Sequence, residues 1–450
     1  MTIFKLPSWA EAIAGKRWNR VLVVLLRLVL GGVFMFSGFV KGIDPWGGYY
    51  KFIDYFNAYG FEHLASVSLF ASFALAALEF VLGLCVMVGA FRRGSVAILL
   101  MLLCVMLPLT LDLALTGRVA DCGCFGDALV LSNRATFWKN VIMFPAMLYL
   151  LSFNRRVHGV YGPAVNWVVA LFAFLFISAI AYLGYFYQPL IDFRPYKVGY
   201  NIGVPSAADI NDDDYVFLYE KNGVTQEFSI DSLPDDDSGW TFIERRFKPG
   251  HEPQPRVIQK TVVILDHGND VTEDVLPNHG KQLMFLFPDL PNVNIAYSFS
   301  LNELAEHAKQ QGMTVVAASA ADSTAVGEWL DISMASYPMY GMDDSELKMV
   351  ARGNPAVVMV DGGKIKWKRT LSSLNEAHVR NKAFAVERLN DDYDEANLLG
   401  GAVWLLMLSM AGLLVLNRTH VLLLMFYRLM RKSRHAMATV SSIKKCNFWQ

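Results

Sequence analysis

Six long apolar segments constrain the fold of this chain more than any other feature of its sequence. A helix needs about 20 mostly apolar residues to cross the hydrocarbon core of a bilayer. Segments of this kind lie at 21–40, 65–90, 95–116, 136–153, 164–187 and 399–416. Hydrophobic residues make up 54% of the 450 residues, a high share for a soluble protein. We therefore predict an integral membrane protein with six α-helical spans that contact the lipid bilayer.

The charges divide the chain into a basic, apolar part and an acidic, water-soluble part. Residues 188–398 hold 33 acidic and 19 basic residues, whereas the rest holds 8 acidic and 21 basic ones. The basic residues flank apolar segments and form no polar basic face, so nucleic acid is not expected as a partner. An N-terminus in the cytoplasm places 15 Lys and Arg on the inner side and 5 in the outer connections. This asymmetry predicts a bacterial inner-membrane protein with both termini cytoplasmic and residues 188–398 in the periplasm.

The predicted domains follow from these segments. They are a cytoplasmic N-terminus (1–20), a four-helix membrane bundle (21–153), a fifth transmembrane helix (154–187), an extended β-rich region (188–280), a second extracytoplasmic domain (281–398), a sixth transmembrane helix (399–416) and a basic cytoplasmic tail (417–450). The apolar, then basic stretch 420–435 is predicted to lie on the inner leaflet. The sequence leaves open whether residues 419–430 lie on the membrane or cross it.

The acidic block begins with short strands and turns and continues as an alternation of strands and helices. The turn signal Asn222-Gly223 predicts a hairpin. The acidic clusters at 212–214 and 235–237 are interpreted as solvated turns, because Asp214 occupies the position that a calcium loop gives to glycine. From 281 onward the order is strand–helix three times and then two strands. A capping box at Ser300 predicts that the first of these helices begins there.

That order, with Pro355 entering the last hairpin, resembles the thioredoxin fold. The resemblance implies a cis peptide bond at Pro355 that faces a redox site. In that family Cys-x-x-Cys stands where the first strand meets its helix, but here residues 288–300, "PDLPNVNIAYSFS", contain no cysteine. The domain is therefore predicted to have no dithiol chemistry of its own and to hold or recruit another protein. The alternative is a purely structural remnant.

A close cysteine pair lies in the connection after the third apolar segment, "VADCGCFGDAL" at 119–129. A disulfide between Cys122 and Cys124 would close a very small ring, in which the entropic stabilisation is weak and the geometry strained. Strained and exposed disulfides exchange faster, so we predict a labile redox pair with Cys122 and Cys124 as catalytic residues. A static disulfide, free thiols and a metal site are the alternatives. No metal is expected, because two thiolates underfill zinc and the loop holds no histidine.

The first four segments show a second resemblance. The stretch "RLVLGGVFMFSGFVKGIDPWGGYYKFIDY", followed by "CGCFG" in the outer loop, resembles the DoxX/MauE group of four-helix membrane proteins over about residues 20–153. The resemblance implies a membrane component associated with thiol–disulfide chemistry or electron transfer. The remaining cysteines are expected to be inert: Cys85 and Cys104 as buried packing residues, and Cys446 as a free thiol in the tail.

Three ionisable residues fall inside predicted spans, where charges are costly and often functional. Glu79 is the candidate proton carrier, and Arg27 and Asp112 are candidates for a polar pocket beneath the thiols. The alternative is an Arg27–Glu79 ion pair that fixes helix register. The aromatic stretch 44–64 is interpreted as an interfacial belt, with a lid over the cysteine loop as the second possibility.

The favoured function is a thiol–disulfide redox component of the cell envelope that exchanges electrons with a partner or client protein through Cys122 and Cys124. A quinone or a second protein would accept the electrons, although no motif identifies either. The main alternative is a non-enzymatic membrane scaffold whose thioredoxin-like domain is a docking module. A transporter that uses Glu79 is a weaker alternative, because the spans show no inverted repeat.

Overall fold

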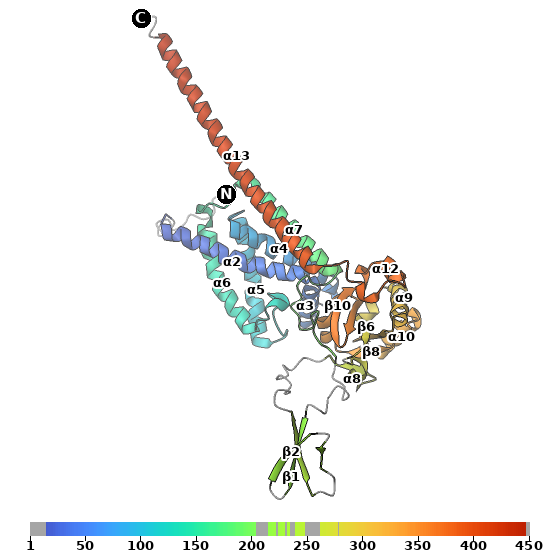
Figure 1. Cartoon of the computed structure of the whole chain (residues 1–450). Coiled ribbons are helices and arrows are strands. Elements are labelled where there is room, and N and C mark those ends of the chain that lie inside the picture. The colour runs from blue at the N-terminus through green and yellow to red at the C-terminus, as the bar shows by residue number, and fades with distance from the viewer. Residues whose placement is uncertain are drawn as a thin grey trace. The chain divides into compact units, whose positions relative to one another are not determined.

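The computed structural model describes residues 15–203, 215–221, 224–229, 232–234, 239–247, 262–277 and 279–446. The predicted hairpin turn at 222–223 and the acidic clusters at 212–214 and 235–237 lie outside these residues. The chain divides into two compact units, each described here by itself (Figure 1). One unit contains residues 1–185, 189–191 and 394–450, and the other contains residues 186–188 and 192–393.

The first unit is helical. Its helices are α2 (Arg17–Ile43), α3 (Pro45–Ala58), the 3-10 helix η1 (Glu62–Val67), α4 (Ser68–Val88), α5 (Gly94–Thr116), α6 (Asn133–Phe153), α7 (Asn166–Phe186) and α13 (Glu395–Cys446). Leucine, valine, methionine and phenylalanine side chains of α2, α4, α5 and α6 share one buried cluster. Helices of this kind that are apolar around most of their surface are typical of membrane spans.

Five helical stretches of the described chain are long and apolar enough to cross a membrane. They are Arg17–Ile43, Glu62–Val88, Gly94–Thr116, Pro163–Phe186 and Glu395–Tyr427. These stretches support a multi-pass membrane protein. The predicted fourth span, α6, is not among them, because polar residues such as Arg134, Lys139 and Asn140 occupy its first two turns. The predicted sixth span lies inside α13, which continues through the stretch 420–435 without a break.

The contact between α2 and α4 brings backbone against backbone. A Cβ atom on Gly38 of α2 would lie 2.6 Å from the carbonyl oxygen of Ala76 and 2.8 Å from the Cα of Phe80 on α4. Gly31 on α2 and Gly83 on α4 oppose each other at similar distance. Small residues that let helices approach closely are typical of helix pairs in membranes. This contact fixes the register of the two helices that carry the polar residues of the candidate site.

The second unit is an α/β domain built on a seven-stranded sheet with the order β10-β9-β6-β7-β8-β4-β5. The strands are β4 (Ile264–Asp266), β5 (Asn269–Asp270), β6 (Lys281–Phe287), β7 (Thr314–Ser319), β8 (Met339–Met342), β9 (Ala356–Asp361) and β10 (Lys364–Thr370). Strands β6, β7 and β8 run parallel, and β9 and β10 are antiparallel additions at one side. The helices are α8 (Thr272–Val275), α9 (Tyr297–Gln310), α10 (Ser323–Ser333), α11 (Asp344–Val350) and α12 (Glu376–Arg380).

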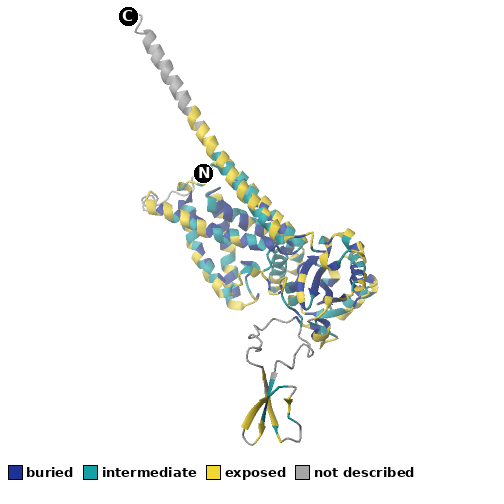
Figure 2. Cartoon of the chain, in the orientation of Figure 1, coloured by how far each residue is buried: buried dark blue, intermediate teal, exposed yellow. Residues whose placement is uncertain are grey.

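Strand β6 is buried on both faces, as its apolar sequence predicts. Phe285 and Phe287 join the cluster that includes α9, whereas Met284 and Leu286 join the cluster that includes α11. The central strands are accordingly dark in Figure 2. The element order from β6 to β10 agrees with the predicted strand–helix alternation.

Helix α9 begins three residues earlier than its predicted capping box. The helix starts at Tyr297, and Ser300 lies within its first turns. The reason is a turn at Asn294, whose side chain accepts a hydrogen bond from the amide of Ala296 at 3.0 Å. The expectation of a cap at Ser300 is therefore wrong.

A three-stranded antiparallel sheet precedes the larger one in the sequence. It consists of β1 (Tyr215–Lys221), β2 (Val224–Phe228) and β3 (Thr241–Phe247) in the order β2-β1-β3. Lys221 pairs with Val224, which is the register of a two-residue hairpin. This is the predicted hairpin, although its turn residues lie outside the described chain.

Candidate functional site: a cysteine pair above a buried ion pair

The Cys-Gly-Cys loop, residues 117–132, joins the end of α5 to the start of α6. Gly123 has a φ of +66°, and its amide donates a 2.8 Å hydrogen bond to Asp121 Oδ1. The chain therefore turns sharply between the two cysteines. The Sγ atoms of Cys122 and Cys124 lie 2.9 Å apart, and both residues are thiols. The two sulfurs are close enough to react with each other or with a third thiol.

Helix α3 covers this loop. The Tyr55 hydroxyl donates a 3.1 Å hydrogen bond to the carbonyl oxygen of Cys122, and Lys51 Nζ lies 3.0 Å from Asp121 Oδ2. Cys122 is buried in a cluster that includes Leu113. Residues of α3 bind the cysteine loop directly, as the second possibility of a lid expects, and the interfacial belt stays a prediction.

A polar group lies beneath the loop, between α2 and α4. Lys41 Nζ is 2.6 Å from Glu79 Oε2, and their side chains are only 11% and 9% exposed. The same ammonium donates to the carbonyl oxygen of Cys124 at 3.0 Å and to Ser37 Oγ at 2.9 Å. Ser37 Oγ is 2.7 Å from Glu79 Oε2 and 2.5 Å from the carbonyl oxygen of Cys124. Helices α2 and α4 thus hold the backbone at Cys124 through a buried ion pair and a hydroxyl.

The structure separates the three ionisable residues that the sequence grouped together. Arg27 donates to Asn154 Oδ1 at 2.5 Å and to the carbonyl oxygens of Val157 and His158 at 2.7 and 2.9 Å. It lies at the end of α6 opposite the cysteine loop and does not pair with Glu79. Both predictions for Arg27, a polar pocket below the thiols and an ion pair with Glu79, are therefore wrong.

Asp112 contacts Tyr59 and is not paired with Glu79 in the described part of the chain. Its Oδ2 accepts a 2.5 Å hydrogen bond from the Tyr59 hydroxyl, and the Arg118 guanidinium lies 5.5 Å from the centre of the Tyr59 ring. These residues connect the end of α5 to the end of α3. The contacts place Asp112 beside the cysteine loop, apart from the Lys41–Glu79 pair.

The two thiols have different electrostatic surroundings. The hydrogen bond between the two sulfurs, together with burial, raises the pKa of Cys122. The same hydrogen bond lowers the pKa of Cys124 to about 6 against the effect of burial, and the positive charges of Lys139 and Lys41 contribute. Cys124 is partly exposed, whereas Cys122 is 8% exposed. Cys124 is therefore the more ionised and the more accessible thiol near neutral pH.

The remaining cysteines of the bundle do not approach the pair. Cys85 is buried beside Ala90 and Val169, and Cys104 is exposed on the surface of α5. The expectation that both are buried is wrong for Cys104. Its exposure on an apolar helix places it at the predicted lipid-facing surface.

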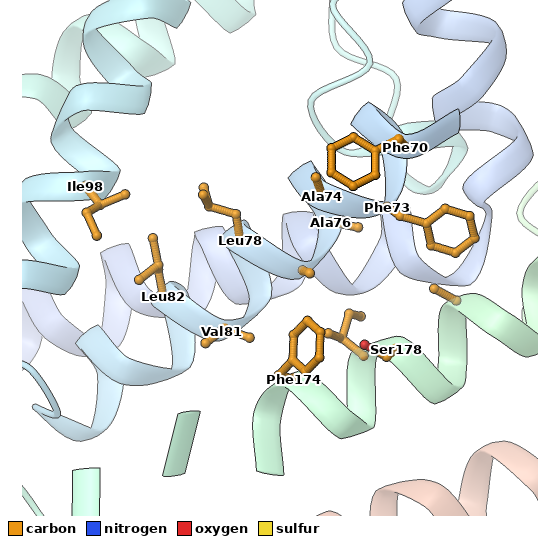
Figure 3. A pocket seen from close by; sticks show the side chains of 13 residues that line it. Phe70, Phe73, Ala74, Ala76, Leu78, Val81, Leu82, Ile98, Phe174 and Ser178 are labelled. Atoms are coloured by element: carbon orange, nitrogen blue, oxygen red, sulfur yellow. The ribbon is translucent and has the colours of Figure 1, made fainter. Parts of the chain in front are cut away.

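A cavity of about 570 Å³ lies on the other side of α4 (Figure 3). Side chains of α4, α5 and α7 line it, and Ser178 is the one polar residue among those that the structure places there. Ala76 lines this cavity, whereas Glu79, one turn later on α4, points to α2. The cavity fits an apolar guest such as a lipid chain, and α4 stands between it and the polar group.

The α/β domain carries a cis Asn354–Pro355 peptide bond, the isomer predicted at Pro355. Asn354 donates from its side-chain amide to the carbonyl oxygen of Asp289 at 2.6 Å and accepts from the amide of Asp289 at 3.3 Å. The loop after β6 is therefore held against the loop that precedes Pro355. The stretch 288–300 contains no cysteine.

Lys41, Ser37 and Tyr55 are the residues that sequence reasoning missed. Ser37 and Lys41 are four residues apart on one helix, so they share a face. This spacing, with a lysine near the end of an apolar segment, was the available signal for Lys41. Nothing in the sequence indicates that Tyr55 reaches the loop, because that contact depends on how α3 folds back.

Replacing Tyr55 with phenylalanine is expected to loosen the cysteine loop. The change removes one hydrogen bond to the Cys122 carbonyl, which contributes about 1 kcal/mol, or roughly a fivefold increase in local opening. The rate of Cys122 alkylation by a maleimide in detergent measures this opening. Tyr59→Phe is the matched control, since Tyr59 binds Asp112 instead. Equal alkylation rates in the two variants would contradict the role given to Tyr55.

Comparisons with known proteins agree with the membrane part of this description. Residues 19–153 match the family described as "Methylamine utilisation protein MauE", and residues 214–248 match a domain of unknown function, DUF8463. No curated protein matches the chain. The first match supports a MauE-like membrane region that includes the cysteine loop.

One solved structure similar to part of the chain is a bacterioferritin comigratory protein of Xanthomonas campestris, described for its alkyl peroxide reduction activity. The similarity covers 34% of this chain and 91% of that chain at 10% identity, with a TM-score of 0.19. At this TM-score the likeness does not establish a shared fold.

Proposed function

We propose that this protein is a thiol–disulfide redox component of a bacterial inner membrane, and that Cys122 and Cys124 exchange electrons with the cysteines of a partner protein. The single observation that carries the proposal is the 2.9 Å approach of two thiols in a loop of a MauE-like membrane region. One thiol is buried and the other is partly exposed, so a partner can reach the pair from one side.

The contacts of the loop argue against a purely structural disulfide. Hydrogen bonds from Tyr55 and Gly123 and the Lys51–Asp121 ion pair already hold the loop. A disulfide across one intervening residue would add little entropic stabilisation and would be strained. Such a bond is better suited to exchange than to bracing.

The proposed topology places both termini in the cytoplasm and the cysteine loop with residues 188–398 in the periplasm. The distribution of Lys and Arg supports this arrangement. Within the bundle, Arg27 and Arg92 gather at the end of α6 opposite the cysteine loop. An oxidising compartment on the thiol side would allow the pair to cycle between dithiol and disulfide.

We propose a thioredoxin-like docking role for the α/β domain. The strand and helix order from β6 to β10 supports it. The domain would recruit the partner or its client while the membrane pair performs the exchange. Fold-level resemblance alone does not identify the client.

Glu79 belongs to this proposal as part of a polar pocket beneath the thiols. Its contacts with Lys41 and Ser37 support that role. A proton-carrying role for Glu79 stays a prediction. A membrane quinone is the candidate electron acceptor on chemical grounds, because quinones take up two electrons and two protons within the bilayer.

The test is thiol trapping in membranes equilibrated at graded redox potential. A chain with Cys85, Cys104 and Cys446 replaced by alanine keeps only the pair, which we expect to titrate as a reversible two-electron couple. The rival function is a non-enzymatic scaffold whose loop only keeps its shape. That rival is favoured if the pair is unreactive at every potential and the Cys122→Ser variant retains full function.

A further inference from the structure

The Lys41–Glu79 ion pair lies directly under the carbonyl oxygen of Cys124. Lys41 is the more informative member, because a lysine at the end of an apolar helix can extend toward water. Here it is buried instead, with its ammonium divided among Glu79, Ser37 and the Cys124 carbonyl. Burying the two charges carries a desolvation cost, which their attraction for each other need not repay. We therefore look for a role of the pair besides stability.

The polar group acts on one thiol of the pair more than on the other. Lys41 and Ser37 contact the backbone of Cys124, whereas Cys122 is held by Tyr55 and packs against apolar side chains. Lys139, on α6, adds a second cation near Cys124 and lies 4.4 Å from the centre of the Phe125 ring. Lys139 acts on both thiols, whereas the effect of Lys41 is to lower the pKa of Cys124.

We propose that Lys41 and Glu79 are positioning residues that make Cys124 the thiol that attacks the partner and Cys122 the thiol that resolves the mixed disulfide. The assignment rests on the proposed exchange function and specifies its chemistry. Lys41 stabilises negative charge on the Cys124 sulfur, and Glu79 opposes it. The ion pair thereby sets how much Cys124 thiolate is present at a given pH.

The exchange balances in two steps. The Cys124 thiolate attacks one sulfur of a partner disulfide, so the partner's S–S bond breaks and a Cys124–partner bond forms, and the other partner sulfur leaves as a thiolate. The Cys122 thiol gives its proton to that leaving thiolate and attacks Cys124 Sγ. The Cys122–Cys124 disulfide forms, the second partner sulfur leaves as a thiolate, and two electrons have passed to the partner. With the proposed quinone as acceptor the sequence runs in reverse. A partner thiolate attacks Cys124 Sγ of the Cys122–Cys124 disulfide, and Cys122 leaves as a thiolate. The second partner thiol loses its proton and displaces Cys124 from the mixed disulfide, so two electrons pass to the pair and on to the quinone.

The experiment measures the pH dependence of alkylation by iodoacetamide in the full-length chain in detergent. The parent variant carries Cys85→Ala, Cys104→Ala, Cys446→Ala and Cys122→Ser, so that Cys124 is the one thiol and the serine keeps a hydrogen-bond donor beside it. Because Lys139 and Lys41 lower the pKa of Cys124, its alkylation rate is expected to rise and level off at a lower pH than that of an ordinary thiol, and the midpoint of this rise is the reference for the ion-pair variants. The corresponding Cys124→Ser variant leaves Cys122, whose burial raises its pKa, so this variant is expected to react more slowly than the parent at every pH of the profile.

Replacing Glu79 and replacing Lys41 are expected to shift the midpoint of this alkylation profile in opposite directions. Glu79→Gln keeps the hydrogen bonds and removes the negative charge, so the midpoint should move down by about 1 pH unit and the rate measured about half a pH unit below the parent midpoint should rise about threefold. Lys41→Gln leaves the Glu79 carboxylate without its cation, so the midpoint should move up by about 1 pH unit and the rate measured about half a pH unit below the parent midpoint should fall about eightfold. The Lys41→Gln/Glu79→Gln double variant, which has no unpaired charge, should return toward the parent profile.

The outcomes separate this inference from the proposed function. Alkylation needs no partner, so profiles that shift as expected support the inference even if the wild-type pair fails to titrate with redox potential. Shifts in the same direction for both single variants, a slower reaction of Glu79→Gln, or faster alkylation of Cys122 than of Cys124 overturn it. If one of these overturning results is found but the wild-type pair still titrates with redox potential, the exchange function is supported and the role of Lys41 and Glu79 is rejected.

Discussion

Replacing Gly38 with alanine is expected to prevent α2 and α4 from packing and to remove the candidate site with them. The new Cβ would meet backbone atoms of Ala76 and Phe80 at 2.6 and 2.8 Å. Backbone atoms of a packed helix cannot move aside as the end of a flexible side chain can. Overpacking of a core costs about 1–3 kcal/mol when side chains adjust, so a backbone clash is expected to cost at least about 3 kcal/mol. Ser37 is adjacent to Gly38 on α2, and Glu79 is adjacent to Phe80 on α4. A shift of α2 against α4 would therefore separate Ser37 from Glu79.

Gly32 provides the matched control on the same helix. A Cβ at Gly32 would meet nothing within 4 Å, so Gly32→Ala removes a glycine without creating a clash. Thermal unfolding of the detergent-solubilised chain, followed by tryptophan fluorescence, compares the two variants. We expect Gly32→Ala to unfold at or slightly above the wild-type temperature, since alanine favours helix. If Gly38→Ala unfolds at the same temperature as Gly32→Ala, the close contact between α2 and α4 is wrong.

The sequence allowed the architecture to be predicted because periodicity and hydropathy are local properties. The apolar strand at 281–287 and the glycine-bounded hairpin at 362–363 each appear where their residue pattern places them. Helix α9 shows the limit of this reasoning. Both Asn294 and Ser300 can start a helix, and the choice between them depends on a turn that the strand before it positions.

The candidate site was only partly predictable, for a similar reason. The cysteine pair is visible as a spacing in the sequence, and its place in an outer loop follows from the apolar segments. The partner of Glu79 is not visible, because Lys41 and Arg27 are both basic residues of the same helix at compatible depths. The outcome depends on the register of α2 against α4, which the close contact at Gly38 sets. Arg27 instead satisfies backbone carbonyls at the end of α6, which no residue pattern in its own helix could indicate.

Removing one member of the Lys41–Glu79 pair is expected to destabilise the bundle strongly. Both side chains are about nine-tenths buried and 2.6 Å apart. Leaving one charge buried without its partner costs about 3–5 kcal/mol in proteins. We therefore expect Lys41→Met and Glu79→Leu each to lower the free energy of unfolding by about this amount, measured by denaturation of the solubilised chain in a titrated denaturing detergent.

The double variant Lys41→Met/Glu79→Leu separates the charge from the packing. Replacing a buried ion pair by apolar side chains of similar size is often neutral, so the double variant should recover most of the stability that each single variant loses. Lys51→Met is the control for a more exposed pair, because Lys51 and Asp121 keep 27% and 26% of their side chains exposed and such pairs contribute about 1 kcal/mol or less. If the two single losses add in the double variant, the residues do not stabilise each other. If the losses cancel and the double variant also keeps the parent alkylation profile of Cys124, the two charges offset each other both in stability and in their effect on the thiol.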